Sequence, residues 1–424
     1  MSSATFSPTS EQLALRDAPA SAAPPLPLVN LEKGQIVPRS WLTVQDGHQT
    51  TSWSVRIMTW NVLIPRKYQG RELFPHSDCL KSAQREHMLF NEILSSDGDI
   101  LCLQEVDRLE KLIPVLEEAK YGHVYAAGPR KKHGSLIAFR KDSYKIHGNI
   151  VVCYDDIDIR PDGSESSRKG LSFRTKNVGN IVALEKVGDP SEGYIVATTH
   201  LFWHPSQAGI LLREVVKYRE GLGLSSWPCI LAGDFNFHPG EPGYALLAGD
   251  ALTLAQEQLL AKSRVVHVSV DPSVPLTASS NEDDESDPDR VITNAREALP
   301  ADGLLSSPEL VELFAVPTRP RSLYDEGQRL LEMTSGPILR CGERLGLPAH
   351  RRGAYEPEWT SYTHYWKSVL DYIWVIDPSD QRAVVTRLLQ PHITDNLEPG
   401  LPRKGVCGSD HVSLATEVRW EGGD

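Results

Sequence analysis

Several short apolar runs in this chain end on polar residues of the kind that bind cations or phosphates. The run at 228–232 ends in Gly233-Asp234-Phe235-Asn236, and Ser409-Asp410-His411 stands just before the run at 412–415. Apolar runs of this length, bounded by turn residues, are typical of buried strands. Oxygen and imidazole ligands grouped at strand ends suit a hard divalent cation and phosphodiester cleavage. Taken alone, the first motif is better explained as a turn capped by its Asp and Asn.

Composition narrows the class of protein. The chain has 424 residues, 40% of them hydrophobic, which is enough for a sizeable core in one large sandwich. Its formal net charge of −12 argues against coating nucleic acid through bulk electrostatics, but allows a local cleft that holds a few nucleotides. Six scattered cysteines without a CxxC pair indicate reduced core thiols. With no long apolar run and no secretory signal, we expect a cytoplasmic and/or nuclear protein without a membrane span, and a mitochondrial location stays open.

The composition of the sequence divides the chain into three regions. Residues 1–50 are rich in Ser, Ala and Pro and are predicted to be a disordered leader. Residues 51–422 are predicted to form one catalytic domain with an acidic, partly disordered insertion at about 263–345, which contains the acidic run 281–290. The patterns predict strands at 53–61, 99–105, 135–139, 194–203, 229–232 and 368–376, and helices at 84–94, 108–120, 207–218, 308–314 and 325–333. This mixture predicts a layered α/β (α+β) sandwich.

Polar residues recur at the ends of the predicted strands. Each has an ordinary explanation as a turn cap, a helix charge, a core histidine or an ion-pair partner. Their shared position at the polar end of an apolar run argues against coincidence. The set is Asn61, Glu105, His200, Asp234, Asn236, Asp371, Asp410 and His411.

Six motifs together resemble the endonuclease/exonuclease/phosphatase superfamily. They are Trp60-Asn61, Leu103-Gln104-Glu105, Thr199-His200-Leu201, Gly233-Asp234-Phe235-Asn236, Leu370-Asp371-Tyr372 and Ser409-Asp410-His411. The resemblance implies a four-layer sandwich, with two mostly antiparallel β-sheets packed face to face and helices outside. The segments 200–205 and 362–373 are similar to the carbon-catabolite-repressor deadenylase branch, and within it to the Ngl-type RNA exonucleases.

The resemblance also implies roles for the motif residues. Glu105 would be the principal Mg²⁺ ligand with Asn61 beside it, Mn²⁺ being an expected substitute. Asp234 and Asn236 would orient the attacking water or share a second metal, and Asp410 would complete the metal or water network. His200 and His411 would donate hydrogen bonds to the phosphate, and Asp371 would hold His411 in the required tautomer.

Five further residues are candidates for substrate binding. Pro205 and Trp366 match a pair that sandwiches a base in this branch, and Trp203 belongs to the same motif. Lys132 and His133 could meet phosphates that flank the cut. Alternatively, Trp366 packs on a sheet edge and the basic cluster is an exposed turn. No leucine-rich repeat pattern of the kind that docks full-length deadenylases is visible.

These features predict a Mg²⁺-dependent 3′→5′ RNA exonuclease that acts as a monomer on a single-stranded RNA 3′ end. It would release 5′-mononucleotides from poly(A) tails or from the 3′ ends of precursor RNA such as rRNA. One alternative is a phosphodiesterase or phosphatase of the same superfamily that acts on a small-molecule or lipid phosphoester. A catalytically silent scaffold is the other alternative, and the six intact motifs argue against it.

Overall fold

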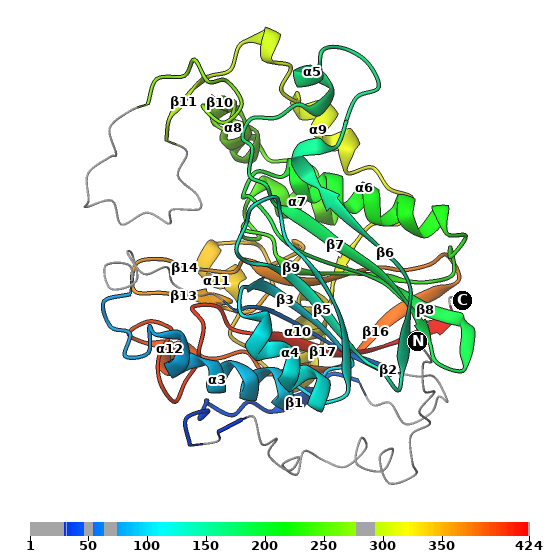
Figure 1. The fold of residues 1–424 in the computed structure, drawn as a ribbon, viewed down its shortest axis with the longest axis vertical. Coiled ribbons are helices and arrows are strands. Elements are labelled where there is room, and N and C mark those ends of the chain that lie inside the picture. The colour runs from blue at the N-terminus through cyan, green and yellow to red at the C-terminus, as the bar shows by residue number, and fades with distance from the viewer. Residues whose placement is uncertain (1–28, 31, 46–53, 63–73, 277–292, 423–424) are drawn as a thin grey trace.

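Two large β-sheets stacked face to face form the centre of the protein (Figure 1). The computed structural model describes residues 29–30, 32–45, 54–62, 74–276 and 293–422, and the elements below lie within them. Sheet A has the strand order β1 (Trp41–Thr43), β16 (Gln381–Leu389), β17 (Leu414–Gly422), β2 (Ser54–Asn61), β3 (Ile100–Val106), β5 (Gly134–Arg140) and β4 (Tyr121–Ala126).

Sheet B has the order β12 (Arg321–Ser322), β15 (Asp371–Ile376), β9 (Cys229–Asp234), β8 (Asp189–His200), β7 (Val178–Lys186) and β6 (Tyr144–Cys153). Neighbouring strands run antiparallel in both sheets except for β2 with β3 and β8 with β9, which are parallel. The carboxyl ends of these two parallel pairs carry four of the six sequence motifs.

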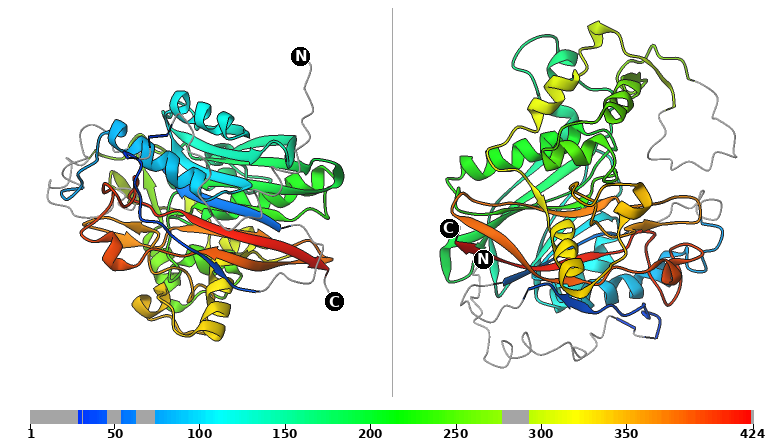
Figure 2. Two further views of the ribbon diagram at one scale, coloured as in Figure 1. Left: turned by 90° about the horizontal axis from the view of Figure 1, so that it is seen from below. Right: turned by 180° about the vertical axis from the view of Figure 1, so that it is seen from behind.

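The strands alternate between two apolar layers. In β2, Val55 and Ile57 enter the core between the sheets, whereas Met58 and Trp60 pack under the outer helices. This two-residue period is what a strand buried on both faces requires. Helices α3 (Ser82–Ser95) and α4 (Leu109–Glu118) cover sheet A, and α6 (Ser206–Gly221) and α7 (Pro242–Ala248) cover sheet B (Figure 2). The result is the predicted four-layer sandwich.

Smaller elements surround the sheets. Short hairpins are β10 (Val265–His267) with β11 (Ala295–Glu297), and β13 (Ser361–Tyr362) with β14 (Lys367–Ser368). The remaining helices are η1 (Tyr154–Asp156), α5 (Glu165–Lys169), α8 (Leu254–Lys262), η2 (Pro300–Asp302), α9 (Ser307–Leu313), α10 (Leu323–Ser335), α11 (Cys341–Leu345) and α12 (Thr394–Leu397). Within the described ranges, no helix combines the length and apolar character that crossing a bilayer would need.

Most predicted elements are confirmed, with three corrections. The predicted leader 1–50 is too long, because Trp41–Thr43 pair with β16 as an edge strand of sheet A. The predicted insertion 263–345 is also too long: β12 pairs with β15, and Leu323 and Tyr324 of α10 lie in the core between the sheets. The predicted strand 368–376 is interrupted at 369–370, where the chain passes from β14 to β15. Residues 1–28 and 281–290 lie outside the described residues.

Candidate active site

Strand register brings the predicted polar residues to one end of the layer between the sheets. Asp234 on β9 is paired with His200 on β8 on one side and with Asp371 on β15 on the other. In each strand these residues keep the alternation of the inter-sheet core positions, for example Ile230, Ala232 and then Asp234. Their side chains therefore point into the space between the sheets, where the apolar core ends.

Two site residues have a left-handed backbone. Glu105 has φ 57°, at a register shift where β3 pairs with β5, and Asn236 has φ 54° in the loop after β9. Residues other than glycine rarely adopt this region, and where they do the strain concentrates at functional sites. Because this register shift interrupts the two-residue alternation of β3, the side chains of the neighbouring residues Gln104 and Glu105 can both contact residues of the site. Gln104 bonds to Thr198, and Glu105 lies beside His200.

Gln104 ties the two sheets together directly beneath the site. Its amide Nε2 donates to the Thr59 hydroxyl of sheet A at 3.1 Å and to the Thr198 hydroxyl of sheet B at 2.8 Å. All three side chains are fully buried. This contact fixes the spacing of the two strand ends that carry Asn61 and His200.

The Asp234 carboxylate is the centre of the site. Its Oδ2 accepts a hydrogen bond from Asn61 Nδ2 at 2.9 Å and lies 3.6 Å from His200 Nε2 and 3.8 Å from His411 Nε2. Its Oδ1 accepts from the backbone N–H of Asn236 at 3.0 Å. Asp234 is 2% exposed, so this carboxylate sits in a low-dielectric environment lined by donors.

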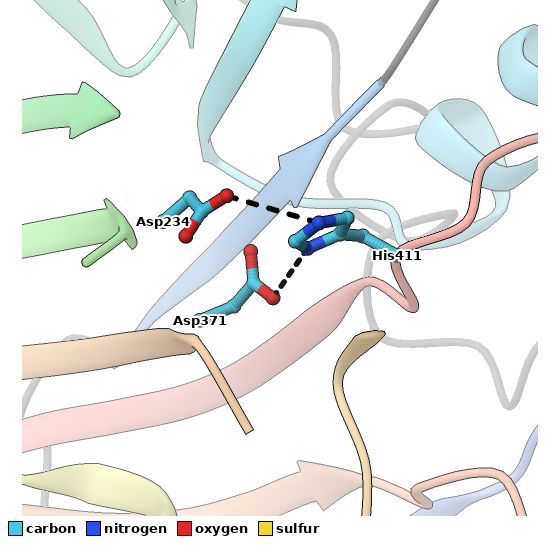
Figure 3. A group of neighbouring side chains, drawn as sticks. All are labelled: Asp234, Asp371 and His411. Atoms are coloured by element: carbon cyan, nitrogen blue, oxygen red, sulfur yellow. Dashed lines mark hydrogen bonds and ion pairs between the residues drawn. The ribbon is translucent and has the colours of Figure 1, made fainter. Parts of the chain in front are cut away.

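A second carboxylate orients His411. Asp371 Oδ2 lies 2.8 Å from His411 Nδ1, and the imidazole stands between Asp371 and Asp234 (Figure 3). Burial lowers the pKa of His411, but the two carboxylates and the hydrogen bond outweigh it and raise the pKa well above its usual value. Burial raises the pKa of Asp371, opposed by His411. The arrangement favours a protonated His411 that directs Nε2–H toward Asp234 and the open end of the site.

Glu105 and Asp410 flank this centre with opposite pKa shifts. Burial would raise the pKa of Glu105, but the hydrogen bond and charge of His200, with smaller contributions from His133 and His411, lower it to about 2. The Glu105 Oε1 to His200 Nδ1 distance is 3.1 Å. Burial, and next to it the negative charge of Glu105, raise the pKa of Asp410 to about 6 against the charge of His411.

The segment before β17 is held to β2 and to the loop before β15. Ser409 Oγ donates to the carbonyl of Asn61 at 2.7 Å, and Trp60 Nε1 donates to the carbonyl of His411 at 2.8 Å. Thr360, which the sequence analysis missed, accepts at its hydroxyl from the backbone N–H groups of Leu370 and Asp371. No pattern of types or spacing marks this threonine, because its role depends on contacts between separate segments.

The structure brings the predicted catalytic and metal residues together, whereas the predicted substrate residues spread around them. His133 lies close enough to Glu105 to affect its pKa, and Lys132 is exposed in the same loop. Trp203 is half-buried, and Pro205 is buried as the N-cap of α6. Trp366 is half-buried, with its ring 6.0 Å from that of Phe74 in an edge contact. The sandwich of a base between Pro205 and Trp366 stays a prediction.

The donor set fits a divalent cation. Asn61 Oδ1 is a buried oxygen that, within the described part of the chain, has no hydrogen-bond partner. Glu105, whose lowered pKa keeps its carboxylate ionised, directly follows Gln104, the β3 residue that is paired with Asn61 of β2. The ligand atoms of Asp234, Asp371 and His411 lie within 4.8 Å of one another, and this second group could hold a metal ion only with His411 deprotonated. Carboxylate and amide oxygens are the ligands that Mg²⁺ and Mn²⁺ prefer.

A two-sheet sandwich with carboxylates, amides and imidazoles at one end of its central layer defines a phosphoester hydrolase by class. The chain belongs to the Endonuclease/Exonuclease/phosphatase family, which it matches over residues 58–411. The superfamily predicted from the six motifs is therefore confirmed.

Individual relatives agree with this assignment. A Schizosaccharomyces pombe protein named as a probable RNA exonuclease is 28% identical over 404 residues, which cover 88% of this chain and 77% of that protein. "RNA exonuclease NGL2" of Saccharomyces cerevisiae is 26% identical over 441 residues, covering 90% and 81%. The solved structure of ANGEL2, a 2′,3′-cyclic phosphatase, has a TM-score of 0.58 at 21% identity, over 91% of this chain and 99% of that one. This last likeness confirms the predicted fold.

Proposed function

We propose that this protein is a divalent-metal-dependent 3′→5′ RNA exonuclease that releases 5′-mononucleotides. The observation that carries the proposal is the Asp234 carboxylate, on which Asn61, His200 and His411 converge. Relatives that match most of this chain are named as RNA exonucleases, which supports RNA as the substrate. The proposed substrates are poly(A) tails or the 3′ ends of precursor RNA such as rRNA.

The proposed metal is Mg²⁺, with Mn²⁺ as a substitute. Glu105 and Asn61 would hold it, because one offers an ionised carboxylate and the other an unpartnered buried oxygen. Asp410 is a further proposed ligand, either of the metal or of a water bound to it. Asp234 and Asn236 would orient the attacking water or share a second metal. A bound cation supplies charge stabilisation at the non-bridging oxygens of the scissile phosphate.

The remaining steps belong to the side chains. Asp234 would orient the attacking water and accept its proton at Oδ2, the oxygen nearest both imidazoles. His200 and His411 would donate from Nε2 to the phosphate as negative charge grows there. Asp371 would keep His411 protonated and fixed through Nδ1, so we propose it as a positioning residue.

A denaturing-gel time course tests the proposal. RNAs labelled at the 5′ end, one ending in oligo(A) and one in mixed sequence, are incubated with Mg²⁺ and with a chelator. Stepwise shortening that requires Mg²⁺ is expected, and arrest at the junction between A and other nucleotides would identify a deadenylase. If neither RNA shortens while an inositol phosphate or abasic duplex DNA is hydrolysed, the RNA proposal is wrong and the alternative phosphoesterase takes its place.

Site variants test the assigned roles. Glu105→Ala and Asp234→Ala are each expected to lower the rate by several orders of magnitude. A loss of less than tenfold, about 1.4 kcal/mol of transition-state stabilisation, would contradict the assignment. The matched control is Glu312→Ala, an exposed position on α9. We further propose a monomer in the cytoplasm and/or nucleus, which size-exclusion chromatography and imaging of a tagged chain would check.

A further inference from the structure

Four aromatic rings from three segments of the chain form a continuous row that starts beside the candidate active site. Phe202 and Trp203 follow the end of β8, and their ring centroids are 5.5 Å apart. Phe173 stacks on Phe202 with centroids 5.3 Å apart and planes 17° from parallel. His267 on β10 continues the row, 4.0 Å from Phe173. All four residues are half-buried. This set is called the aromatic row below.

Hydrogen bonds fix the outer end of the aromatic row. The backbone N–H of His267 donates to the carbonyl of Ser172 at 3.0 Å, and the N–H of Arg174 donates to the Ser269 hydroxyl at 3.0 Å. The Ser269 N–H donates to His267 Nδ1, which leaves Nδ1 unprotonated, and burial lowers the pKa of this imidazole. The row therefore ends on a neutral, oriented ring.

Gln207 fixes the inner end. Its Oε1 accepts from the N–H of Phe202 at 2.9 Å, and its Nε2 donates to the Thr175 hydroxyl at 2.8 Å. The carboxylate of Asp155 accepts from the N–H groups of Thr175 and Lys176, so the loop that carries Phe173 is anchored from a second side. A surface held in place before binding loses little entropy when a flexible strand docks on it.

Cationic side chains border the aromatic row. Arg174 and Lys176 stand on either side of Thr175, are exposed, and form no ion pair with any described residue. Arg264 is exposed at the start of the β10 segment, and its charge helps to lower the pKa of His204, the neighbour of Trp203 in the chain. In a chain with a formal net charge of −12, three cationic side chains thus lie near the half-buried rings, and the Asp155 carboxylate is bonded to the backbone of the same loop.

We propose that the aromatic row is the path taken by the RNA strand upstream of the scissile phosphate, with its bases against the ring surfaces that the row leaves uncovered and its phosphates near Arg174 and Lys176. The proposal rests on the proposed function and deepens it, since it extends the substrate contacts from His200 outward to β10. Aromatic faces flanked by cations bind single-stranded RNA without reading its sequence. It assigns a role to the β10–β11 hairpin, which lies beside α5 and α8 at one end of the molecule (Figure 1).

The competing explanation is that the rings merely pack this hairpin onto the loop 170–176. Packing requires apolar volume, whereas base stacking requires an aromatic face. Phe173→Leu keeps the first and removes the second, and His267→Phe keeps a ring where His267→Val does not. The Phe173→Leu variant and the comparison of His267→Phe with His267→Val therefore separate RNA stacking from simple packing.

The experiment compares kcat/KM for a dinucleotide and an octanucleotide in Mg²⁺, for the wild type and for each variant. The kcat/KM for the octanucleotide divided by that for the dinucleotide is expected to fall at least about fivefold in Phe173→Leu and His267→Val. This decrease is the equivalent of one lost stacking contact. His267→Phe is expected to keep the ratio. His147→Ala is the matched control, because His147 contacts Trp227 near the opposite end of sheet B.

Binding provides a readout that does not depend on cleavage. An octanucleotide with 2-aminopurine upstream of its 3′ end is titrated into the Glu105→Ala protein, where stacking quenches the fluorescence. Quenching that disappears with Phe173→Leu supports the proposal even if the wild type cleaves no RNA, an outcome that would overturn only the proposed function. An unchanged length ratio together with unchanged quenching in Phe173→Leu would overturn the aromatic row as an RNA path.

Discussion

The buried carboxyl of Glu356 should make the stability of this protein depend on pH. Glu356 is fully buried behind sheet B, and its Oε1 accepts from the Tyr244 hydroxyl at 2.8 Å. Burial, and next to it the negative charge of Asp325, raise its pKa from 4.5 to about 8 against the hydroxyls of Ser322 and Tyr244. At neutral pH the folded protein therefore holds a proton that the unfolded chain releases.

The sign and size of the effect follow from linkage. Between pH 4.5 and about 8 the folded state binds more protons than the unfolded state, so the free energy of unfolding falls as pH rises. At roughly 1.4 kcal/mol per pH unit, the full interval is worth at most about 5 kcal/mol. Glu356→Gln removes the titrating group and keeps a carbonyl oxygen for Tyr244. The variant should therefore gain stability relative to the wild type as pH rises, approaching a constant advantage above pH 8.

Urea unfolding followed by tryptophan fluorescence, at several pH values from 5 to 9, measures this difference. Comparing the two proteins at each pH cancels the other titrating groups that they share. Glu312→Gln, an exposed change on α9, should track the wild type throughout. If the difference between wild type and Glu356→Gln stays constant across the range, the Glu356 carboxyl titrates alike in both states and the reasoning is refuted.

Three further predictions concern the site and its supports. Gly233→Ala would place a Cβ 2.3 Å from the Thr199 carbonyl oxygen, so urea unfolding should show a loss of about 1–3 kcal/mol, and an unchanged midpoint would contradict the close approach. Gln104→Ala removes the amide that joins the sheets and should cost about 1–3 kcal/mol by the same assay, with wild-type stability as the refuting result. Asp371→Asn removes a charge that raises the pKa of His411, so the alkaline limb of the kcat–pH profile should move to lower pH; an unmoved limb would exclude the positioning role.

The buried strands are the part of the fold that the sequence predicted best. The run that ends at Asp234 is buried on both faces, so its length and its flanking turn residues marked it as a strand. The same reasoning failed for Trp41–Thr43, because three residues are too few to show a period and their Ser/Ala/Pro-rich surroundings dominate the composition. The helix α10 was predicted correctly, but it was wrongly assigned to the insertion, because amphipathic helices look alike whether they cover a core or stand on an insertion, and only the packing of Leu323 and Tyr324 distinguishes them.

The aromatic row shows why the outer part of a substrate path is harder to predict than its catalytic centre. Asp234, His200 and His411 lie in short sequence motifs next to apolar runs, so each can be recognised from its neighbours in the sequence. Phe173 and His267 stand in segments without such a motif, and their rings meet where hydrogen bonds from His267 to Ser172 and from Arg174 to Ser269 join those segments. The negative net charge adds to the difficulty, since charges beyond about 8–10 Å are screened at physiological salt and only cations beside the strand count. Whole-chain charge thus excludes a broad basic surface, whereas the placement of Arg174 and Lys176 decides whether a short strand can be held.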